Sequence, residues 1–328
     1  MRVLVTGGSG FLGSHIAEQL SMQGITVRAL VRRTSNLKFL KSLPNIEFAE
    51  GSVEDRGPVT EAVKGVDAII HSAGLVKARN EREFFDTNVT GTENLLDAAV
   101  AHTPSLKRFV FVSSLAVVGP SSDGKPVLSS QTPRPVTRYG RSKLEAEKLV
   151  YAARESLPVT IIRPPAIYGP RDAETFAFFQ SVSRGVLPML GDGRNTLSVA
   201  YVADVADACI RAIDANSPSG KAYFVDDGFV YEWRRALEDV ESALGKRAFL
   251  RVGLPFPVIT LAALASEIYG RFTNKAVMLT RDKLNELTQR HWVCSSDDTR
   301  KDLGWEPKVR WREGTVMAAK WYRDNGWI

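Results

Sequence analysis

The chain has 328 residues, of which 44% are hydrophobic and 24% are charged, and its net charge is +6. These values are typical of a globular protein with one two-lobed fold or two domains. The positive charge is spread along the chain, without the basic stripe and interleaved aromatic residues of a nucleic-acid groove, so we expect no nucleic-acid partner. The longest apolar run, 254–264, is too short to span a bilayer and contains two prolines, so we expect no membrane span. We favour a buried core helix for this run, the alternative being a helix that faces lipid or substrate.

The first predicted elements are a short apolar strand over 3–6, a glycine turn and an amphipathic helix. This order, with glycines at 7, 10 and 13, is the fingerprint of dinucleotide binding. Gly7 would make the tight turn, Gly10 would let the backbone approach a pyrophosphate, and Gly13 would let the helix pack on the strand. The N–H groups at the start of the helix would face the phosphates. We therefore expect a bound dinucleotide.

Apolar strands alternate with amphipathic helices up to about residue 165. The predicted strands are 26–31, 46–49, 66–71, 109–113 and 159–162, and the predicted helices are 11–23, 59–63, 83–102 and 138–155. This alternation predicts an α/β fold with a doubly wound parallel sheet, a Rossmann fold, with helices on both faces. Ligands of such sheets bind at the carboxyl ends of the strands.

The alternation fades after residue 165, where short strands mix with helices at 202–215, 232–244, 281–287 and 312–325. We therefore predict a dinucleotide-binding Rossmann domain over 1–165 and a smaller mixed α/β substrate-binding lobe over 166–328. Some segments, such as 196–215, would pack back on the Rossmann domain. All six tryptophans lie after residue 165. They would form the core of the smaller lobe or, alternatively, part of an aromatic substrate pocket.

The cysteine and histidine content bears on location and on metals. Two cysteines, Cys209 and Cys294, in a chain that enters a strand at once predict a reducing, cytoplasmic setting without a targeting segment. The four histidines lack the spacing of metal ligands, and His71 reads as a residue at a strand end. We predict no metal site.

A phenol and an ammonium group stand four residues apart at Tyr139 and Lys143, and on a helix these positions share one face. A free phenol has a pKa near 10, which is too high for proton exchange at neutral pH, and a nearby lysine would lower that pKa. Ser113 and Ser114 end the preceding strand, where a hydroxyl would orient a substrate carbonyl. Taken alone, Tyr139 and Lys143 would be interpreted as an exposed pair on a solvated helix face, but the glycine fingerprint upstream favours a catalytic set.

These residues belong to a series of motifs that resembles the extended short-chain dehydrogenase/reductase family, and the series covers nearly the whole chain in family order. The motifs are Thr6-Gly7-Gly8-Ser9-Gly10-Phe11-Leu12-Gly13, Asn88-Val89-Thr90-Gly91-Thr92-Glu93-Asn94, Val112-Ser113-Ser114, Tyr139 to Lys143, Arg163-Pro164-Pro165-Ala166-Ile167-Tyr168-Gly169-Pro170, Val202-Ala203-Asp204-Val205-Ala206 and Leu303-Gly304-Trp305-Glu306-Pro307.

The resemblance implies Ser114 as the substrate-orienting hydroxyl, Tyr139 as the general acid/base, and Lys143 as both modulator of the pKa and ribose ligand. Ser114 is preferred to Ser113 because its separation of 25 residues from Tyr139 matches the family. The resemblance also implies a homodimer and a set of cofactor-binding residues. That set is Gly7, Gly10, Phe11, Leu12, Gly13, Arg32, Ser52, Val53, Ser72, Ala73, Gly74, Asn88, Tyr139, Lys143, Pro165 and Ile167.

The end of the second strand indicates which cofactor is bound. A free ribose 2′-hydroxyl calls for an acidic residue there, whereas this chain has Arg32 and Arg33. An arginine holds a 2′-phosphate through charge-assisted hydrogen bonds. We therefore favour NADP(H) over NAD(H), the alternative being that Arg32 stacks on adenine or faces solvent. Ser52 stands where the family usually has aspartate, which weakens any acid-mediated contact with adenosine.

The sequence is compatible with two classes of enzyme that act on different substrates. The first class is the sugar-nucleotide epimerases or dehydratases, which use tightly bound NAD and commonly have an arginine at the position of Leu197. In the dehydratases an aspartate and a glutamate usually follow the catalytic hydroxyl, where this chain has Leu115 and Ala116. Arg194 would be a substitute cation. The chain resembles more closely the 3β-hydroxysteroid dehydrogenase and dihydroflavonol reductase branch. We favour reversible hydride transfer between NADP(H) and a hydroxyl or ketone of a mainly apolar substrate, such as a steroid, flavonoid or β-keto acid. A non-catalytic cofactor-binding sensor is the third hypothesis.

Overall fold

The computed structural model describes residues 1–328, and its centre is a seven-stranded sheet in which all neighbouring strands are parallel. In spatial order the strands are β11 (Ala222–Phe224), β6 (Val159–Arg163), β5 (Arg108–Val112), β4 (Ala68–His71), β1 (Arg2–Thr6), β2 (Thr26–Val31) and β3 (Ile46–Glu50). The strand order reverses between β1 and β4, which creates the crevice where such sheets bind ligands. The predicted doubly wound parallel sheet is confirmed.

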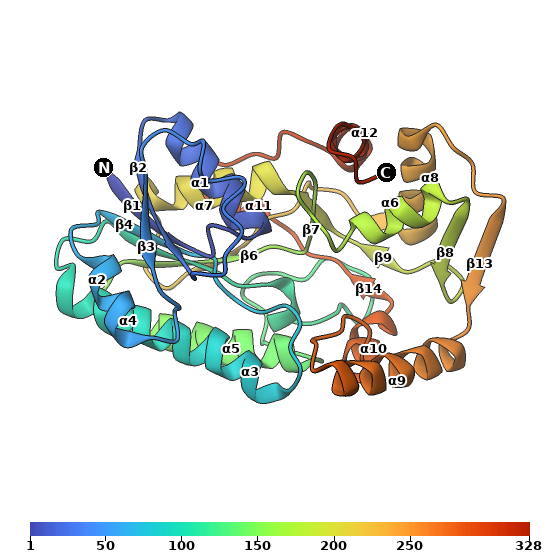
Figure 1. The fold of residues 1–328 in the computed structure, drawn as a ribbon, viewed down its shortest axis with the longest axis horizontal. Helices are drawn as coiled ribbons and strands as arrows, with labels where there is room; N and C mark the ends of the chain where they lie inside the picture. Colours follow the sequence, from blue (N-terminus) through green and yellow to red (C-terminus); the bar gives the residue numbers. More distant parts are fainter.

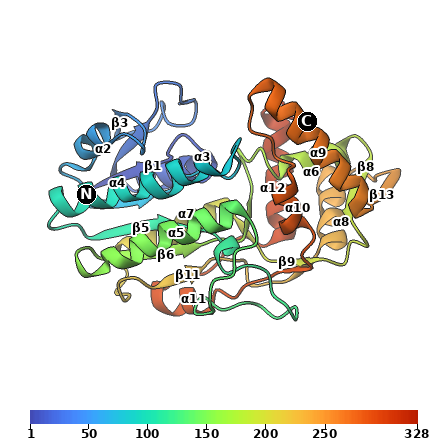
Figure 2. The same cartoon turned by 90° about the horizontal axis from the view of Figure 1, so that it is seen from below.

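Helices cover both faces of this sheet (Figure 1). One face carries α1 (Phe11–Met22), α7 (Val202–Asp214) and α11 (Asp297–Leu303), and the other carries α2 (Arg56–Val63), α4 (Gly91–His102) and α5 (Arg138–Ala152). Strand β1 shows why both faces are apolar: Val3 and Val5 pack with α1 and α7, while Leu4 packs with α2 and α4. Figure 2, seen from below, shows α4 and α5 side by side in front of the sheet.

Three elements of these layers, α7, β11 and α11, follow residue 165 in the sequence. Helix α7 packs on α1, and β11 pairs with β6 at the edge of the sheet. The domain boundary at residue 165 stays a prediction. The predicted helix 83–102 is divided into α3 (Glu81–Phe85), a π-helical turn over Asp86–Thr90, and α4.

A smaller set of strands and helices follows β6. Its strand pairs are β7 (Ala166–Tyr168) with β10 (Val199–Tyr201) and β8 (Val186–Leu190) with β13 (Leu250–Leu254), and a third sheet joins β12 (Tyr231–Glu232), β9 (Thr196–Leu197) and β14 (His291–Trp292). Helices α6 (Phe176–Ser183), α8 (Trp233–Leu244) and α12 (Trp311–Asp324) surround an aromatic core. Trp311 is buried in this aromatic core, whereas Trp305 is buried against the seven-stranded sheet. Trp233, Trp292 and Trp311 line the main cavity, and their part in a substrate pocket stays a prediction.

The predicted core helix is wrong in its placement. The apolar run 254–264 contributes to α9 (Phe256–Thr273), which lies along the outer edge of the molecule beside α10 (Arg281–Leu287; Figure 1). Among the described side chains of α9, Ile259, Ala263 and Gly270 are buried, while most of its apolar residues face solvent. No helix within the described residues has both the length and the apolar character needed to cross a bilayer.

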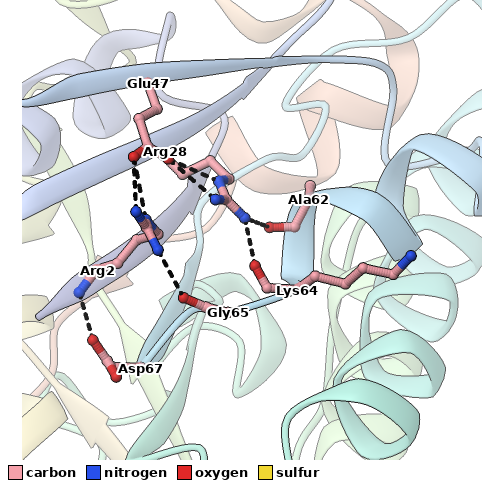
Figure 3. Close-up of polar contacts among 7 residues, drawn as sticks. All are labelled: Arg2, Arg28, Glu47, Ala62, Lys64, Gly65 and Asp67. Atoms are coloured by element: carbon pink, nitrogen blue, oxygen red, sulfur yellow. Dashed lines mark hydrogen bonds and ion pairs between the residues drawn. The ribbon is translucent and has the colours of Figure 1, made fainter.

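A cluster of polar contacts ties the strands together at the edge opposite to their carboxyl ends (Figure 3). The Glu47 carboxylate accepts hydrogen bonds from the Arg2 and Arg28 guanidinium groups at 3.1–3.3 Å. Arg28 also donates to the Ala62 and Lys64 carbonyls, and Arg2 donates to the Gly65 carbonyl. Burial raises the pKa of Glu47, but the hydrogen bonds from the two arginines outweigh burial and lower that pKa below its ordinary value. These contacts join β1, β2 and β3 to the turn after α2.

Candidate active site

The glycine turn between β1 and α1 is packed so closely that its backbone leaves no room for side chains. Gly7 has φ +71°, a conformation that favours glycine, and the Gly10 N–H donates to the Gly7 carbonyl at 2.9 Å. A Cβ atom at Gly13 would lie 2.1 Å from the Gly7 carbonyl oxygen, and one at Gly7 would lie 2.7 Å from the Ala73 nitrogen. Helix α1 begins at Phe11, directly after this turn.

A cavity of about 1720 Å³ runs along the carboxyl ends of the strands, past the glycine turn and into the smaller lobe. Its walls include every residue predicted to bind the cofactor except one. These are Gly7, Gly10, Phe11, Leu12, Gly13, Arg32, Ser52, Val53, Ser72, Ala73, Gly74, Tyr139, Lys143, Pro165 and Ile167, and Ser114 lines the same cavity. The glycine turn is a cradle that a Cβ atom would fill, with a helix N-terminus behind it. This shape and these donors fit a dinucleotide.

Asn88 is the exception among the predicted cofactor residues. Its side chain is buried and is absent from the described cavity wall. The amide group accepts a hydrogen bond from the Leu75 N–H at 2.8 Å and donates to the Leu75 carbonyl and to the Ser142 hydroxyl. Asn88 therefore holds a cavity-lining loop against α5, and its contact with the cofactor stays a prediction.

Tyr139 and Lys143 lie in the first two turns of α5, as the four-residue spacing predicts. The Thr137 hydroxyl caps this helix by accepting a hydrogen bond from the Gly140 N–H at 3.1 Å. The Lys143 ammonium is buried, donates to the Val112 carbonyl at 2.9 Å and lies 4.8 Å from the centre of the Phe111 ring. Both side chains line the cavity.

Ser114 follows the end of β5 and caps a short 3-10 turn over Leu115–Val117. Its hydroxyl oxygen accepts a hydrogen bond from the Ala116 N–H at 3.1 Å, so its hydrogen is left to be donated. Ser113 also lines the cavity, but it is buried, and no described group hydrogen-bonds to its hydroxyl.

The pKa of Tyr139 differs in direction from the expectation. Burial raises this pKa to about 12, a hydrogen bond with Ser114 opposes that rise, and the Glu286 carboxylate adds to it. Burial lowers the pKa of Lys143 to about 8, while the Glu147 carboxylate raises it. The expected lowering of the Tyr139 pKa by Lys143 is not found, because burial dominates at both groups. Near neutral pH, Tyr139 therefore carries its proton.

The sequence analysis missed the carboxylate behind Lys143. Glu147 lies one turn further along α5 and is buried, and it accepts hydrogen bonds from Arg163 at 2.6 and 2.8 Å. Arg163 ends β6 and also donates to the Ser129 carbonyl at 2.8 Å. The signal was present in the sequence, since Glu147 has the same four-residue spacing from Lys143 that Lys143 has from Tyr139.

His71 is more than a residue at a strand end. It is buried at the end of β4 between the Thr6 hydroxyl, 2.6 Å from Nδ1, and the Thr92 hydroxyl, 2.9 Å from Nε2. Thr92 donates its own hydrogen to the Asn88 carbonyl, so it accepts from Nε2–H, and Thr6 donates to Nδ1. Burial, together with the charge of Lys143, lowers the pKa of His71 to about 3 and keeps the ring neutral.

This histidine belongs to a continuous chain of buried hydrogen bonds. The Ala73 N–H donates to Thr6 beside the glycine turn, and beyond Thr92 the Asn88 amide donates to Ser142. The Ser142 hydroxyl then donates to the Tyr139 carbonyl at 2.8 Å. The chain thus connects the strand that carries the glycine turn with the helix that carries Tyr139.

Arg32 lies just past β2 and lines the cavity together with Ser35. The Ser35 hydroxyl accepts a hydrogen bond from the Arg32 N–H at 3.0 Å, and the Ser35 N–H donates to the Arg32 carbonyl. Neither Arg33 nor Thr34 is part of the described cavity wall. The described histidine, cysteine, aspartate and glutamate side chains form no group of three or more that would hold a metal ion.

The fold and the cavity define an NAD(P)-dependent enzyme of the extended short-chain dehydrogenase/reductase class, which acts on CH–OH groups. Residues 3–225 match the model of the NAD dependent epimerase/dehydratase family, and the chain belongs to that family.

Similar proteins cover nearly the whole chain. It is 32% identical to a ceramide reductase from Caulobacter vibrioides, over 99% of this chain and 96% of that one. It is also 32% identical, over 96% and 94% of the two chains, to a 4-hydroxy-2-methyl-3-oxo-4-farnesyl-3,4-dihydroquinoline-1-oxide ketoreductase from Stigmatella aurantiaca. Among solved structures, DesIV, a dTDP-glucose 4,6-dehydratase from Streptomyces venezuelae with NAD bound, is 25% identical with a TM-score of 0.81 and covers 100% of this chain and 98% of that one.

The packing of Gly13 on Gly7 generates the first prediction. Gly13→Ala places a methyl group where the Gly7 carbonyl oxygen lies, so we expect the free energy of unfolding to fall by about 1–3 kcal/mol and dinucleotide affinity to fall with it. Chemical denaturation and fluorescence titration would measure the two effects. Gly57→Ala is the control, because a Cβ atom there meets no described atom within 4 Å. Equal stability and affinity in the two variants would contradict the packing argument.

The surroundings of Lys143 generate the second prediction. Its pKa of about 8 would appear in NMR titration of the lysine ε-carbon, well below the ordinary value. Glu147→Gln removes the negative charge that favours the ammonium form, so we expect the pKa of Lys143 to fall further. Glu145→Gln, which affects an exposed residue paired with Lys148 on the same helix, should leave it unchanged. A Lys143 that titrates near 10.5 in all three proteins would refute the burial argument.

Proposed function

We propose that this protein is an NADP(H)-dependent oxidoreductase that transfers a hydride between the nicotinamide and a hydroxyl or ketone of a mainly apolar substrate. The observation that carries this proposal is one continuous cavity that contains Ser114, Tyr139 and Lys143 between the glycine turn and a section in the smaller lobe, where large apolar side chains share the wall with charged residues of 267–286. A polar reaction centre at the junction of a cofactor channel and an apolar chamber suits a ketone on a hydrophobic skeleton.

The protein's own side chains would manage the proton and the orientation of the substrate. When bound, NADP(H) supplies or accepts the hydride. In the reductive direction, Tyr139 would give its proton to the carbonyl oxygen, and the pKa of about 12 supports this direction because the phenol carries its proton near neutral pH. The Ser114 hydroxyl, which is hydrogen-bonded with Tyr139 here, would donate to the same carbonyl oxygen, and the Lys143 ammonium would stabilise the phenolate that remains.

The preference for NADP(H) is supported by Arg32. The side chain is exposed at the cavity wall, and no described carboxylate lies within ion-pair distance of it. A guanidinium group in this position would meet a 2′-phosphate with two parallel hydrogen bonds, and the Ser35 hydroxyl lies beside it.

The apolar character of the substrate is supported by the walls of the cavity in the smaller lobe. They include Phe178, Trp233, Leu237, Val240 and Met278, and Phe84 of α3 joins them from the Rossmann domain. The ceramide reductase and the farnesyl-dihydroquinoline-oxide ketoreductase are named for substrates with long hydrocarbon parts. We propose a substrate of the same chemical kind, with a ketone or hydroxyl close to an extended apolar group.

A sugar-nucleotide epimerase or dehydratase is the second candidate, favoured by the likeness to the DesIV dehydratase. The cavity wall argues against it. Leu197 lines the cavity where the family's diphosphate-binding arginine is expected, and Arg194, the possible substitute, is exposed and outside the described wall. Leu115 and Ala116 are buried behind Ser114 and offer no carboxylate for an elimination. We therefore favour the ketoreductase.

The proposed role of Tyr139 gives the third prediction. Tyr139→Phe removes the transferable proton and keeps the ring, so turnover of a ketone substrate should fall by about 10²–10⁴-fold while NADPH binding stays nearly unchanged. A panel of 3-oxoacyl and steroid ketones, followed by NADPH absorbance, would measure turnover. Tyr151→Phe is the matched control, on an exposed position of the same helix. Near-normal turnover in Tyr139→Phe would overturn this assignment.

The fourth prediction concerns the choice of cofactor. Arg32→Ala should weaken NADPH binding by roughly 1.5–3 kcal/mol, the usual size for hydrogen bonds to charged groups, and should barely change NADH binding. Raised salt should narrow the difference between the cofactors. Arg33→Ala is the matched control, since the neighbouring arginine does not line the cavity. Equal affinities of the unmutated protein for NADPH and NADH would show that Arg32 is only a surface charge.

A further inference from the structure

The outer face of α9 is apolar where a surface helix is ordinarily polar. Of the 21 large hydrophobic side chains that are exposed in the described structure, ten lie between residues 249 and 278. Leu261 is 68% exposed, Phe272 is 87% exposed and Phe249, just before β13, is 84% exposed. One of the ten, Met278, lines the cavity, and the other nine form what we call the α9 face: Phe249, Leu250, Phe256, Val258, Leu261, Leu264, Ile268, Tyr269 and Phe272. An exposed patch of this kind marks an interaction site.

The helix is attached to the protein along a narrow line. Its buried residues, Ile259, Ala263 and Gly270, share one side, and Ile259 and Ala263 pack on Leu284 of α10. Leu261, Leu264 and Ile268 follow one another at spacings of three and four residues, which places them on one exposed side of the helix and makes an apolar stripe along it. The stripe is thus a second apolar face, separate from the one that holds α9 in place.

The segment that carries the α9 face is rich in basic residues, while acidic residues stand on the neighbouring helices α8 and α10. Residues 246–281 contain six basic residues, Lys246, Arg247, Arg251, Arg271, Lys275 and Arg281, and one acidic residue, Glu267. Glu267 is paired with Arg281, and Arg251 is paired with Glu238 and Glu241. The other four basic residues have no carboxylate within 4 Å among the described side chains. A cationic border around an apolar stripe matches a surface that is apolar inside and anionic at its boundary.

The same helix forms part of the cavity wall. Glu267, Gly270 and Arg271 line the cavity from the inner side of α9, and the segment that follows, with Lys275 and Met278, continues that wall. Helix α9 therefore carries the exposed apolar stripe on its outer side and part of the cavity wall on its inner side.

We propose that the α9 face lies in the headgroup region of a membrane that contains anionic lipids, and that the substrate chamber opens next to that surface. The helix would lie on the bilayer and not cross it, in line with the lack of a spanning helix in the described chain. This surface would deliver an apolar substrate to the cavity, and that use rests on the proposed function. The binding of the α9 face to the membrane does not rest on it. A second copy of the chain fits less well, because a two-fold contact through this face would bring two cationic borders together.

Vesicle sedimentation of the full chain, without substrate, tests the proposal. We expect binding to vesicles of phosphatidylcholine with about 30% phosphatidylglycerol, and weaker binding to phosphatidylcholine alone or at raised salt. The variant Leu261→Glu/Phe272→Glu changes two exposed side chains outside the cavity wall and should weaken binding by about tenfold to a hundredfold. The matched control is Val100→Glu/Val316→Glu, which changes exposed valines on α4 and α12 and should bind like the unmutated protein.

The outcomes separate this inference from the proposed function. Three results would overturn the membrane proposal. They are no vesicle binding by the unmutated chain, an equal loss of binding in both double variants, and equal binding to neutral and anionic vesicles. Light scattering would measure the oligomeric state of the same variants. If Leu261→Glu/Phe272→Glu changed the oligomeric state and left vesicle binding unchanged, the α9 face would be a contact between copies of the chain, and the membrane proposal would be overturned. Turnover of a short water-soluble ketone should be the same in both double variants, so a failed ketone assay would count against the ketoreductase alone.

Discussion

The contact between the backbone of Gly13 and the carbonyl oxygen of Gly7 sets the position of α1 on the sheet, and much of the site depends on it. A Cβ atom at either glycine would lie closer to backbone atoms than such atoms ever approach. Because this approach is fixed by backbone and not by flexible side chains, the N-terminus of α1 always faces the crevice between β1 and β4. The cavity wall can therefore combine residues from β2, β5, α5, the segment after β4 and the smaller lobe.

Hydrogen bonds carry this geometry from the glycine turn to the catalytic helix. Neutral His71 accepts from Thr6 at one nitrogen and donates to Thr92 at the other, so a single tautomer satisfies both partners. A buried chain in which each member has its partner resists distortion, since any break would leave an unpaired polar group away from water. The π-helical turn over Asp86–Thr90 contributes Asn88, whose amide ties the chain to Ser142 beneath Tyr139.

Burial and charge act in opposite directions at the reaction centre. Burial raises the pKa of Tyr139 and lowers the pKa of Lys143, which keeps a proton donor ready next to a lysine whose charge is sensitive to its surroundings. Glu147 supports the ammonium form of Lys143 while Arg163 holds Glu147 in place. The acid/base set is thus arranged in layers along α5, from Tyr139 at the cavity to the Glu147–Arg163 pair behind it.

The sequence by itself determined the parallel sheet, the glycine turn and the pairing of Tyr139 with Lys143, because each follows from local rules: strand and helix periodicity, the small size of glycine, and the four-residue repeat of a helix. Only the tertiary structure decided that Asn88 supports the site from behind, that His71 joins two elements, and that burial outweighs the lysine at Tyr139. It also placed α9 on the surface, where an apolar run of the same composition was expected in the core. The spacing of apolar residues predicts that a helix has an apolar face. Whether the rest of the protein buries that face depends on residues that are distant in the sequence.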